Sequence, residues 1–296
     1  MDSKPKGDAC ETSTFEYVRP GSLPEALEAL ARHAPAGRIL AGGQSLVPMM
    51  NLRLVKPAVL IDINRVPGLA DIRVEGGELV VGALARHAAL LSSELVAKHC
   101  PLMAEAYRHV AHGPIRNRGT LGGNISHADP ASEMPAVLAA CEAKIGVRSA
   151  KRARTVPATE FFTGALATAL ADGEMVTEIR IPIAKPGQGA AWREVANRQG
   201  DFAMAGVAAV VTVAGGKCTH ASVAVAGMER PGVRLPAVEK QLVGTALDAA
   251  AIAAAGRMAA DVVRPSGSYH ADPVYKCELV ETLTTLALAA ARERAR

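Results

Sequence analysis

Aromatic residues are scarce in this chain, which limits both its core and the ligands it can bind. Among 296 residues there are one Trp, four Tyr and four Phe, although 49% of the residues are hydrophobic. The core must therefore be built mainly from Ala, Val, Leu and Ile. Nucleic-acid binding needs clustered basic residues and aromatic rings that stack on bases. Here 33 basic residues are interspersed with 29 acidic ones, and the basic run at 151–154 is short, so no nucleic-acid partner is expected.

Cysteine pairs at short spacing are also absent. The five cysteines are scattered along the chain, at Cys10, Cys100, Cys141, Cys218 and Cys277. No CxxC pair occurs among them, so neither a zinc site nor an iron–sulfur cluster is expected in this chain, and no metal site is predicted. An odd number of scattered cysteines is typical of a reducing compartment.

Long apolar runs are missing as well. The first residues are polar and lack the apolar core of a signal peptide, so residues 1–13 are interpreted as a flexible leader. The longest apolar stretch, at 202–214, is too short to span a bilayer as a helix. We therefore expect a cytoplasmic protein without a transmembrane segment.

The hydrophobic patterns predict an α+β fold. Ser22 and Glu25 form a capping box, so a helix is expected to begin after Ser22. Two segments, 72–84 and 144–156, have the alternation of β-hairpins. Further strands are expected at 38–40, 59–63 and 174–181, and helical segments at 46–54, 86–98, 102–111 and 135–141. Tight hairpins favour α+β over an alternating parallel sheet.

A proline–glycine segment at 185–189 is the best candidate for a linker. It predicts a first domain over 14–185 and a second over 186–296. In the second domain we expect strands near 190–197, 203–214 and 218–227, and helices at 246–262 and 278–290.

The first of two glycine-rich loops follows the strand at 38–40. Glycine permits a positive φ and lets backbone N–H groups approach an anion closely, so such a loop suits a pyrophosphate. It is neither a GxGxxG fingerprint nor a P-loop, and a double glycine in a turn is more often structural. Its residues are Leu40, Ala41, Gly42, Gly43, Gln44, Ser45 and Leu46.

The second loop has a basic entry and another double glycine, at Gly122 and Gly123. Glu133 lies ten residues beyond, and a carboxylate can accept hydrogen bonds from ribose hydroxyls. Two separate loops of the kind that binds phosphate favour a dinucleotide over a mononucleotide as the ligand. His127 and Asp129 are interpreted as a polar turn before Pro130 rather than as a metal pair, because no third ligand is near.

Several longer segments then become recognisable together: "AGGQSLVPMMNLRL", "LIDINRVPGL", "IRNRGTLGGNISHADPASEMPAVLAA", "RQGDFAMAGVAAVV" and "YKCEL". With these segments the chain resembles the medium, FAD-binding subunit of carbon monoxide dehydrogenase and related molybdenum hydroxylases of the xanthine dehydrogenase type. The resemblance runs from about residue 15 to the C-terminal helix.

The resemblance implies a PCMH-type FAD-binding domain, as in vanillyl-alcohol oxidase, made of two α+β subdomains. A smaller C-terminal domain with an antiparallel sheet and helices would follow. No catalytic side chain is implied, because the chemistry belongs to the cofactor. His87, His109, His112 and His127 are interpreted as surface or turn residues. The resemblance assigns FAD to residues 40–46 and to Val110, Thr120, Gly122, Gly123, Asn124, Glu133, Val176 and Arg193.

The resemblance also implies partners. A large subunit would carry the molybdenum cofactor, and a small subunit would carry two [2Fe–2S] clusters. Electrons would pass from molybdenum through the clusters to FAD here and on to an external acceptor, in a dimer of heterotrimers. Two alternatives are a stand-alone flavin oxidoreductase of the same fold and a scaffold protein without cofactor.

Overall fold

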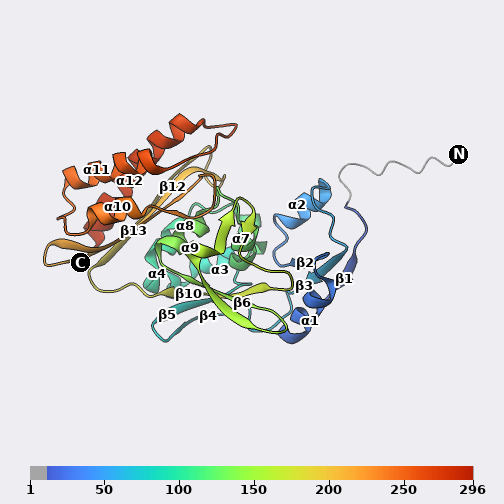
Figure 1. Cartoon of the computed structure of the whole chain (residues 1–296). Helices are drawn as coiled ribbons and strands as arrows, with labels where there is room; N and C mark the ends of the chain where they lie inside the picture. Colours follow the sequence, from blue (N-terminus) through green and yellow to red (C-terminus); the bar gives the residue numbers. More distant parts are fainter. Residues whose placement is uncertain (1–11, 296) are drawn as a thin grey trace.

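The computed structural model describes residues 12–295, and three bodies lie side by side in it (Figure 1). A small N-terminal unit with a parallel sheet adjoins a central unit with an antiparallel sheet. A C-terminal unit with a second antiparallel sheet follows. The predicted leader falls almost entirely outside the described residues. The α+β prediction is confirmed.

The N-terminal unit brings the first glycine loop to the end of a strand. Its sheet has the order β1-β3-β2, with all pairs parallel. Helix α1 starts as predicted, because Ser22 accepts a hydrogen bond from the Glu25 amide. Its apolar face covers the sheet through Ala26, Leu27 and Leu30. The elements are β1 (Glu16–Val18), α1 (Leu23–His33), β2 (Gly37–Leu40), α2 (Leu46–Asn51) and β3 (Val59–Asp62).

The central unit is built on a five-stranded antiparallel sheet. Both predicted hairpins are present in it, and the long strand β10 lies between them, in the order β4-β5-β10-β6-β7. A separate pair, β8 and β9, lies beside it. The strands are β4 (Ile72–Glu75), β5 (Glu78–Gly82), β6 (Lys144–Arg148), β7 (Ala153–Pro157), β8 (Phe162–Gly164), β9 (Ala167–Thr168) and β10 (Met175–Pro182).

Short helices cover one side of this sheet. The helix predicted over 86–98 is broken at Ser93, whose side chain caps the next helix by accepting from the Val96 amide. The helix predicted over 102–111 ends at Ala106. The helices are α3 (His87–Ser92), α4 (Glu94–His99), α5 (Pro101–Ala106), α6 (Gly113–Arg118), α7 (Leu121–His127), α8 (Glu133–Ala140) and α9 (Ala158–Phe161).

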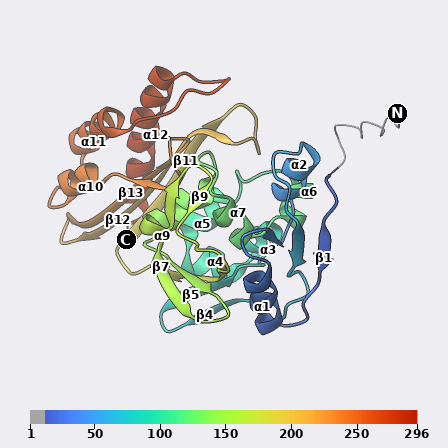
Figure 2. The same cartoon turned by 45° about the vertical axis from the view of Figure 1, so that its right-hand side comes forward.

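The C-terminal unit is a sheet covered by long helices (Figures 1 and 2). Helix α12 packs on β11 and β12, so closely that a Cβ at Gly189 would lie 1.9 Å from the Ala291 carbonyl oxygen. α12 begins five residues before the predicted start, because Asp272 caps it. The elements are β11 (Gln188–Ala196), β12 (Ala203–Ala214), β13 (Lys217–Ala226), β14 (Val233–Arg234), α10 (Pro236–Leu242), α11 (Ala249–Val262) and α12 (Pro273–Arg294).

Within residues 12–295 no group of three or more His, Cys, Asp or Glu side chains is arranged to hold a metal ion. Over the same residues no helix has both the length and the apolar character needed to cross a membrane.

Candidate functional site

The first glycine loop presents a row of free backbone donors. It leaves β2 at Leu40 and turns through Gly43, whose φ is +71°. This conformation favours glycine, because a Cβ would strain the turn. Among the described residues, no group accepts a hydrogen bond from the amides of residues 42–46. Consecutive unpaired amides in a tight turn form a binding site for an anion.

The second glycine loop forms the beginning of helix α7. Thr120 caps α7, and its hydroxyl accepts from the Gly123 amide at 3.1 Å. The Asn124 amide donates to the Thr120 carbonyl oxygen, and the Gly122 amide donates to the Ala83 carbonyl oxygen. The amides of this loop are therefore used inside the protein, unlike those of the first loop.

The two loops touch each other through their backbones. A Cβ at Gly42 would lie 2.3 Å from the Arg118 carbonyl oxygen and 2.8 Å from Gly119 Cα. A Cβ at Gly123 would have open space around it except for the Thr120 hydroxyl at 2.9 Å and Ala41 Cβ at 3.9 Å. We call residues 41–46 and 119–124 together the cradle. Its glycines permit the close contact between the loops.

The segment that precedes α3 supports the cradle from behind. Gly122 packs on Ala83, and a Cβ added there would lie 2.6 Å from the Ala83 carbonyl oxygen. The ring of His87 packs on Gly119 in the same way, with Cδ2 2.6 Å from the position of an added Cβ. His87 is buried, which corrects the prediction that it is a surface or turn residue. Burial, together with the charges of Arg86 and Arg116, lowers its pKa to about 4.

Glu133 lies next to Ser132, which is hydrogen-bonded to Asn124 of the cradle. The Asn124 side-chain nitrogen donates to the Ser132 hydroxyl at 2.8 Å, and Glu133 begins α8 directly after Ser132. The Glu133 side chain is buried, with 3% exposed. Burial raises its pKa to about 8, helped by the charges of Glu194 and Asp129. At neutral pH the carboxyl is protonated, whereas the sequence interpretation had assumed a carboxylate.

His127 and Asp129 lie near each other at the end of α7. Their nearest nitrogen and oxygen are 3.9 Å apart. Asp129 instead accepts from the Ala131 amide at 2.9 Å, which is the polar turn that was predicted.

Three residues predicted to contact FAD lie outside the cradle. Val110 and Val176 are both buried; the Val110 carbonyl oxygen accepts from Arg116 at 3.0 Å, and Val176 pairs with Val147 inside the sheet. Arg193, on β11, donates to Glu105 at 2.7 Å. Their expected contacts with FAD remain predictions.

Glu105 is a contact point between the central and C-terminal units. It accepts hydrogen bonds from Arg294, Arg193 and the Trp192 amide. Burial raises the pKa of Glu105, but these three donors outweigh burial and leave the pKa below its ordinary value.

Replacing Glu105 with alanine is therefore expected to lower the free energy of unfolding by about 2–4 kcal/mol, because three donors lose their charged acceptor. Urea denaturation measures the change. The matched control is Glu28→Ala, at an exposed position of α1, where the loss should stay within about 0.5 kcal/mol. Equal losses in the two variants would contradict this account of Glu105.

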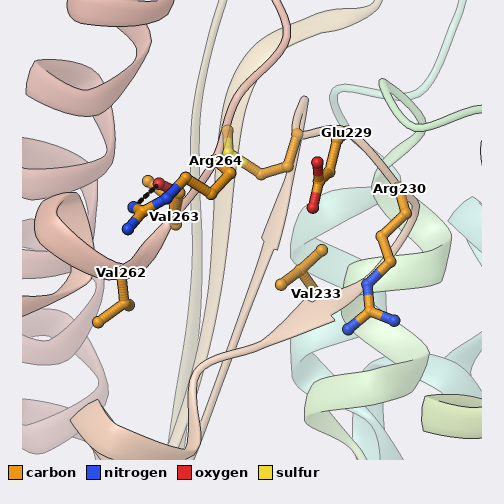
Figure 3. Close-up of a pocket in the computed structure, with 7 residues that line it drawn as sticks. Glu229, Arg230, Val233, Val262, Val263 and Arg264 are labelled. Carbon is orange, nitrogen blue, oxygen red and sulfur yellow. Dashed lines mark hydrogen bonds between the residues drawn. The ribbon is translucent and has the colours of Figure 1, made fainter.

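A separate pocket of about 210 Å³ lies in the C-terminal unit, between the end of α11 and the β13–β14 turn (Figure 3). Its polar side chains, Glu229, Arg230 and Arg264, are all exposed. The Arg264 guanidinium points away from Glu229 and donates to the carbonyl oxygens of Asp261 and Val263. No two of these groups converge on one point, so the cradle remains the candidate site.

The cradle fits the diphosphate of a dinucleotide. Five open amides offer hydrogen bonds to anionic oxygens, and the glycines allow the ligand to approach the backbone. The contact between the loops could not be read from the sequence, because Gly42 and Arg118 are far apart along the chain. Asn64 and Arg86, whose side chains donate to backbone oxygens of Ala41 and Arg118, were also missed. Asn64 lies within the segment "LIDINRVPGL", which was recognised without a role for this residue.

Comparisons with known proteins agree with this geometry. Residues 13–184 match the family described as the FAD binding domain in molybdopterin dehydrogenase. Residues 190–291 match the CO dehydrogenase flavoprotein C-terminal domain. The chain is 38% identical to the 6-hydroxypseudooxynicotine dehydrogenase complex subunit alpha of Paenarthrobacter nicotinovorans, over 96% of both chains. It is 44% identical to caffeine dehydrogenase subunit beta of a Pseudomonas species, over 78% of this chain and 79% of that one.

Solved structures show the same fold. A chain of carbon monoxide dehydrogenase from Hydrogenophaga pseudoflava has a TM-score of 0.94 at 38% identity, covering 97% of this chain and 100% of that one. A chain of quinoline 2-oxidoreductase from Pseudomonas putida has a TM-score of 0.90 at 34% identity, covering 96% and 98%. The chain therefore belongs to the family of FAD-binding medium subunits of molybdenum hydroxylases, which are oxidoreductases of the carbon monoxide dehydrogenase and xanthine dehydrogenase type.

Proposed function

We propose that this chain is the electron-transfer flavoprotein of a three-subunit molybdenum hydroxylase. It receives electrons from two [2Fe–2S] clusters in a small subunit and passes them to an external acceptor. A large subunit with the molybdenum cofactor oxidises the substrate, and two such heterotrimers form a dimer. The observation that carries the proposal is the cradle, whose open amides lie in a chain that matches the flavoprotein family over nearly its whole length.

The residues of the cradle have distinct roles in this proposal. The amides of residues 42–46 donate to the diphosphate of FAD, while Gly123, which has no side chain, lets the cofactor approach the second loop. Glu133, kept neutral by burial, can both donate to and accept from a hydroxyl group of the cofactor. When bound, FAD supplies one- and two-electron redox chemistry, while the chain positions it and sets its surroundings.

Substrate choice is assigned to another subunit. The relatives of this chain are named for chemically unrelated substrates, among them carbon monoxide, caffeine and quinoline. One fold that serves all of them does not need a substrate pocket of its own. The scarcity of aromatic residues and the absence of a converging polar pocket in the described residues also count against a stand-alone oxidoreductase.

The test is the composition of the complex that this chain forms in its native host. A tagged copy should co-purify with two further polypeptides and with about one molybdenum and about four iron atoms per FAD, measured by mass spectrometry. Addition of the external acceptor to the reduced complex should reoxidise the flavin. FAD on the isolated chain without partners would instead indicate a stand-alone oxidoreductase. A chain with neither flavin nor partners would indicate a scaffold.

A further inference from the structure

Asn64 lies beside the first loop, two residues after β3. Its side-chain nitrogen donates to the Ala41 carbonyl oxygen at 2.8 Å and to Asp62 at 2.6 Å. Asp62 also accepts from the Asn64 amide at 2.9 Å and from the Tyr17 hydroxyl. The side-chain nitrogen has two hydrogens, and both are used. Asp62 therefore fixes the orientation in which Asn64 holds the first loop.

Arg86 connects Asn64 to the second loop. Its guanidinium donates to the Asn64 side-chain oxygen at 2.6 Å and, through its other terminal nitrogen, to the Arg118 carbonyl oxygen. That same carbonyl oxygen is the atom against which Gly42 packs. The Arg86 backbone is also attached to the second loop, because the His87 amide donates to Gly119 and the Leu121 amide donates to Ala85.

These contacts form one continuous connection from Ala41 through Asn64 and Arg86 to Arg118. We propose that Asn64 and Arg86 are positioning residues that lock the two glycine loops into a single diphosphate-binding surface. The proposal rests on the proposed function, since it concerns how the FAD site is preorganised. If the loops are already fixed before FAD binds, they lose less conformational entropy on binding, and the free-energy cost of binding is smaller.

The charges around Arg86 support the same role. Burial lowers the pKa of Arg86, and the charge of Arg118 lowers it further, while Asp62 opposes both. Two guanidinium groups are thus held near each other beside the cradle. An anionic diphosphate would relieve their repulsion. A planar guanidinium can also donate in two directions at once, which a lysine ammonium at this position cannot do with the same geometry.

The test is a double-mutant cycle on the full chain, with FAD affinity measured by fluorescence titration. Asn64→Ala should weaken FAD binding about tenfold, and Arg86→Lys, which keeps the charge, should weaken it similarly. The dissociation constant of the double variant should exceed that of either single variant by no more than about twofold, because each substitution removes the same connection. Asn117→Ala, at an exposed position of α6 outside this connection, is the control and should bind FAD normally.

A second measurement separates positioning from folding. Asn64 is exposed, so the thermal midpoint of the apo form should be the same in Asn64→Ala and in wild type. Affinity lost only together with stability would overturn the proposal, as would unchanged FAD affinity in Asn64→Ala, or Arg86→Lys behaving as wild type. Wild-type protein that binds no FAD, even in its assembled complex, would contradict the proposed function itself.

Discussion

Replacing Gly42 with alanine is expected to abolish FAD retention, with the dissociation constant rising more than about 100-fold. The new Cβ would lie 2.3 Å from the Arg118 carbonyl oxygen and 2.8 Å from Gly119 Cα. Both are backbone atoms, so no side-chain rotation relieves the clash and the loops must move apart. The open amides of the first loop then change position relative to the second loop. Flavin content after purification, and titration with added FAD, measure the effect.

The matched control is Gly113→Ala. Gly113 begins α6, close to the second loop in sequence, and a Cβ there meets nothing within 4 Å. This variant should retain FAD as wild type does. Gly123 is an intermediate case, because its added Cβ would press on the Thr120 hydroxyl at 2.9 Å, a side chain that can rotate. Normal flavin content in Gly42→Ala would show that contact between the loops is not needed for binding.

Replacing Glu133 with glutamine is expected to stabilise the apo protein at pH 8 by up to about 4 kcal/mol. The ordinary pKa of a glutamate is 4.5, and burial, with Glu194 and Asp129, raises that of Glu133 to about 8. Between these two values the folded protein binds a proton that the unfolded chain does not. The free energy of unfolding of wild type should therefore fall as pH rises from about 4.5 to about 8.

Glutamine is neutral at every pH in this range, so the variant should lose that part of the slope. Urea denaturation of both proteins at pH 5, 6, 7 and 8 compares the slopes, and the difference between them should vanish near pH 5. Glu160→Gln, at an exposed position of α9, should keep the wild-type slope. Parallel curves for wild type and Glu133→Gln would mean that the carboxyl is ionised in the folded protein.

Local signals allowed much of the fold to be predicted. The Ser22 cap, both hairpins of the central sheet and the three long strands of the C-terminal unit depend on neighbouring residues, and they are confirmed. The predicted boundaries of the longer helices were wrong where an N-cap residue was overlooked. Ser93 splits one predicted helix, and Asp272 starts the last helix earlier than expected.

The candidate site was only partly predictable, because its decisive contacts join distant segments. Both double glycines were identified, but the sequence shows a glycine and not what it packs against. The Arg118 carbonyl oxygen leaves no room for a side chain at Gly42, and Ala83 leaves none at Gly122. The proton on Glu133 likewise depends on burial and on the charge of Glu194 in β11, which no local pattern reveals.

The central claim is that the cradle holds FAD, and the absorbance spectrum of the complex purified from its native host tests it most directly. Heat release followed by chromatography would identify the flavin and its amount. The account predicts about one FAD per chain, with additional iron–sulfur absorbance from co-purifying subunits. A complex without flavin, even after addition of FAD, would mean that the two glycine loops serve only the fold and would contradict the account.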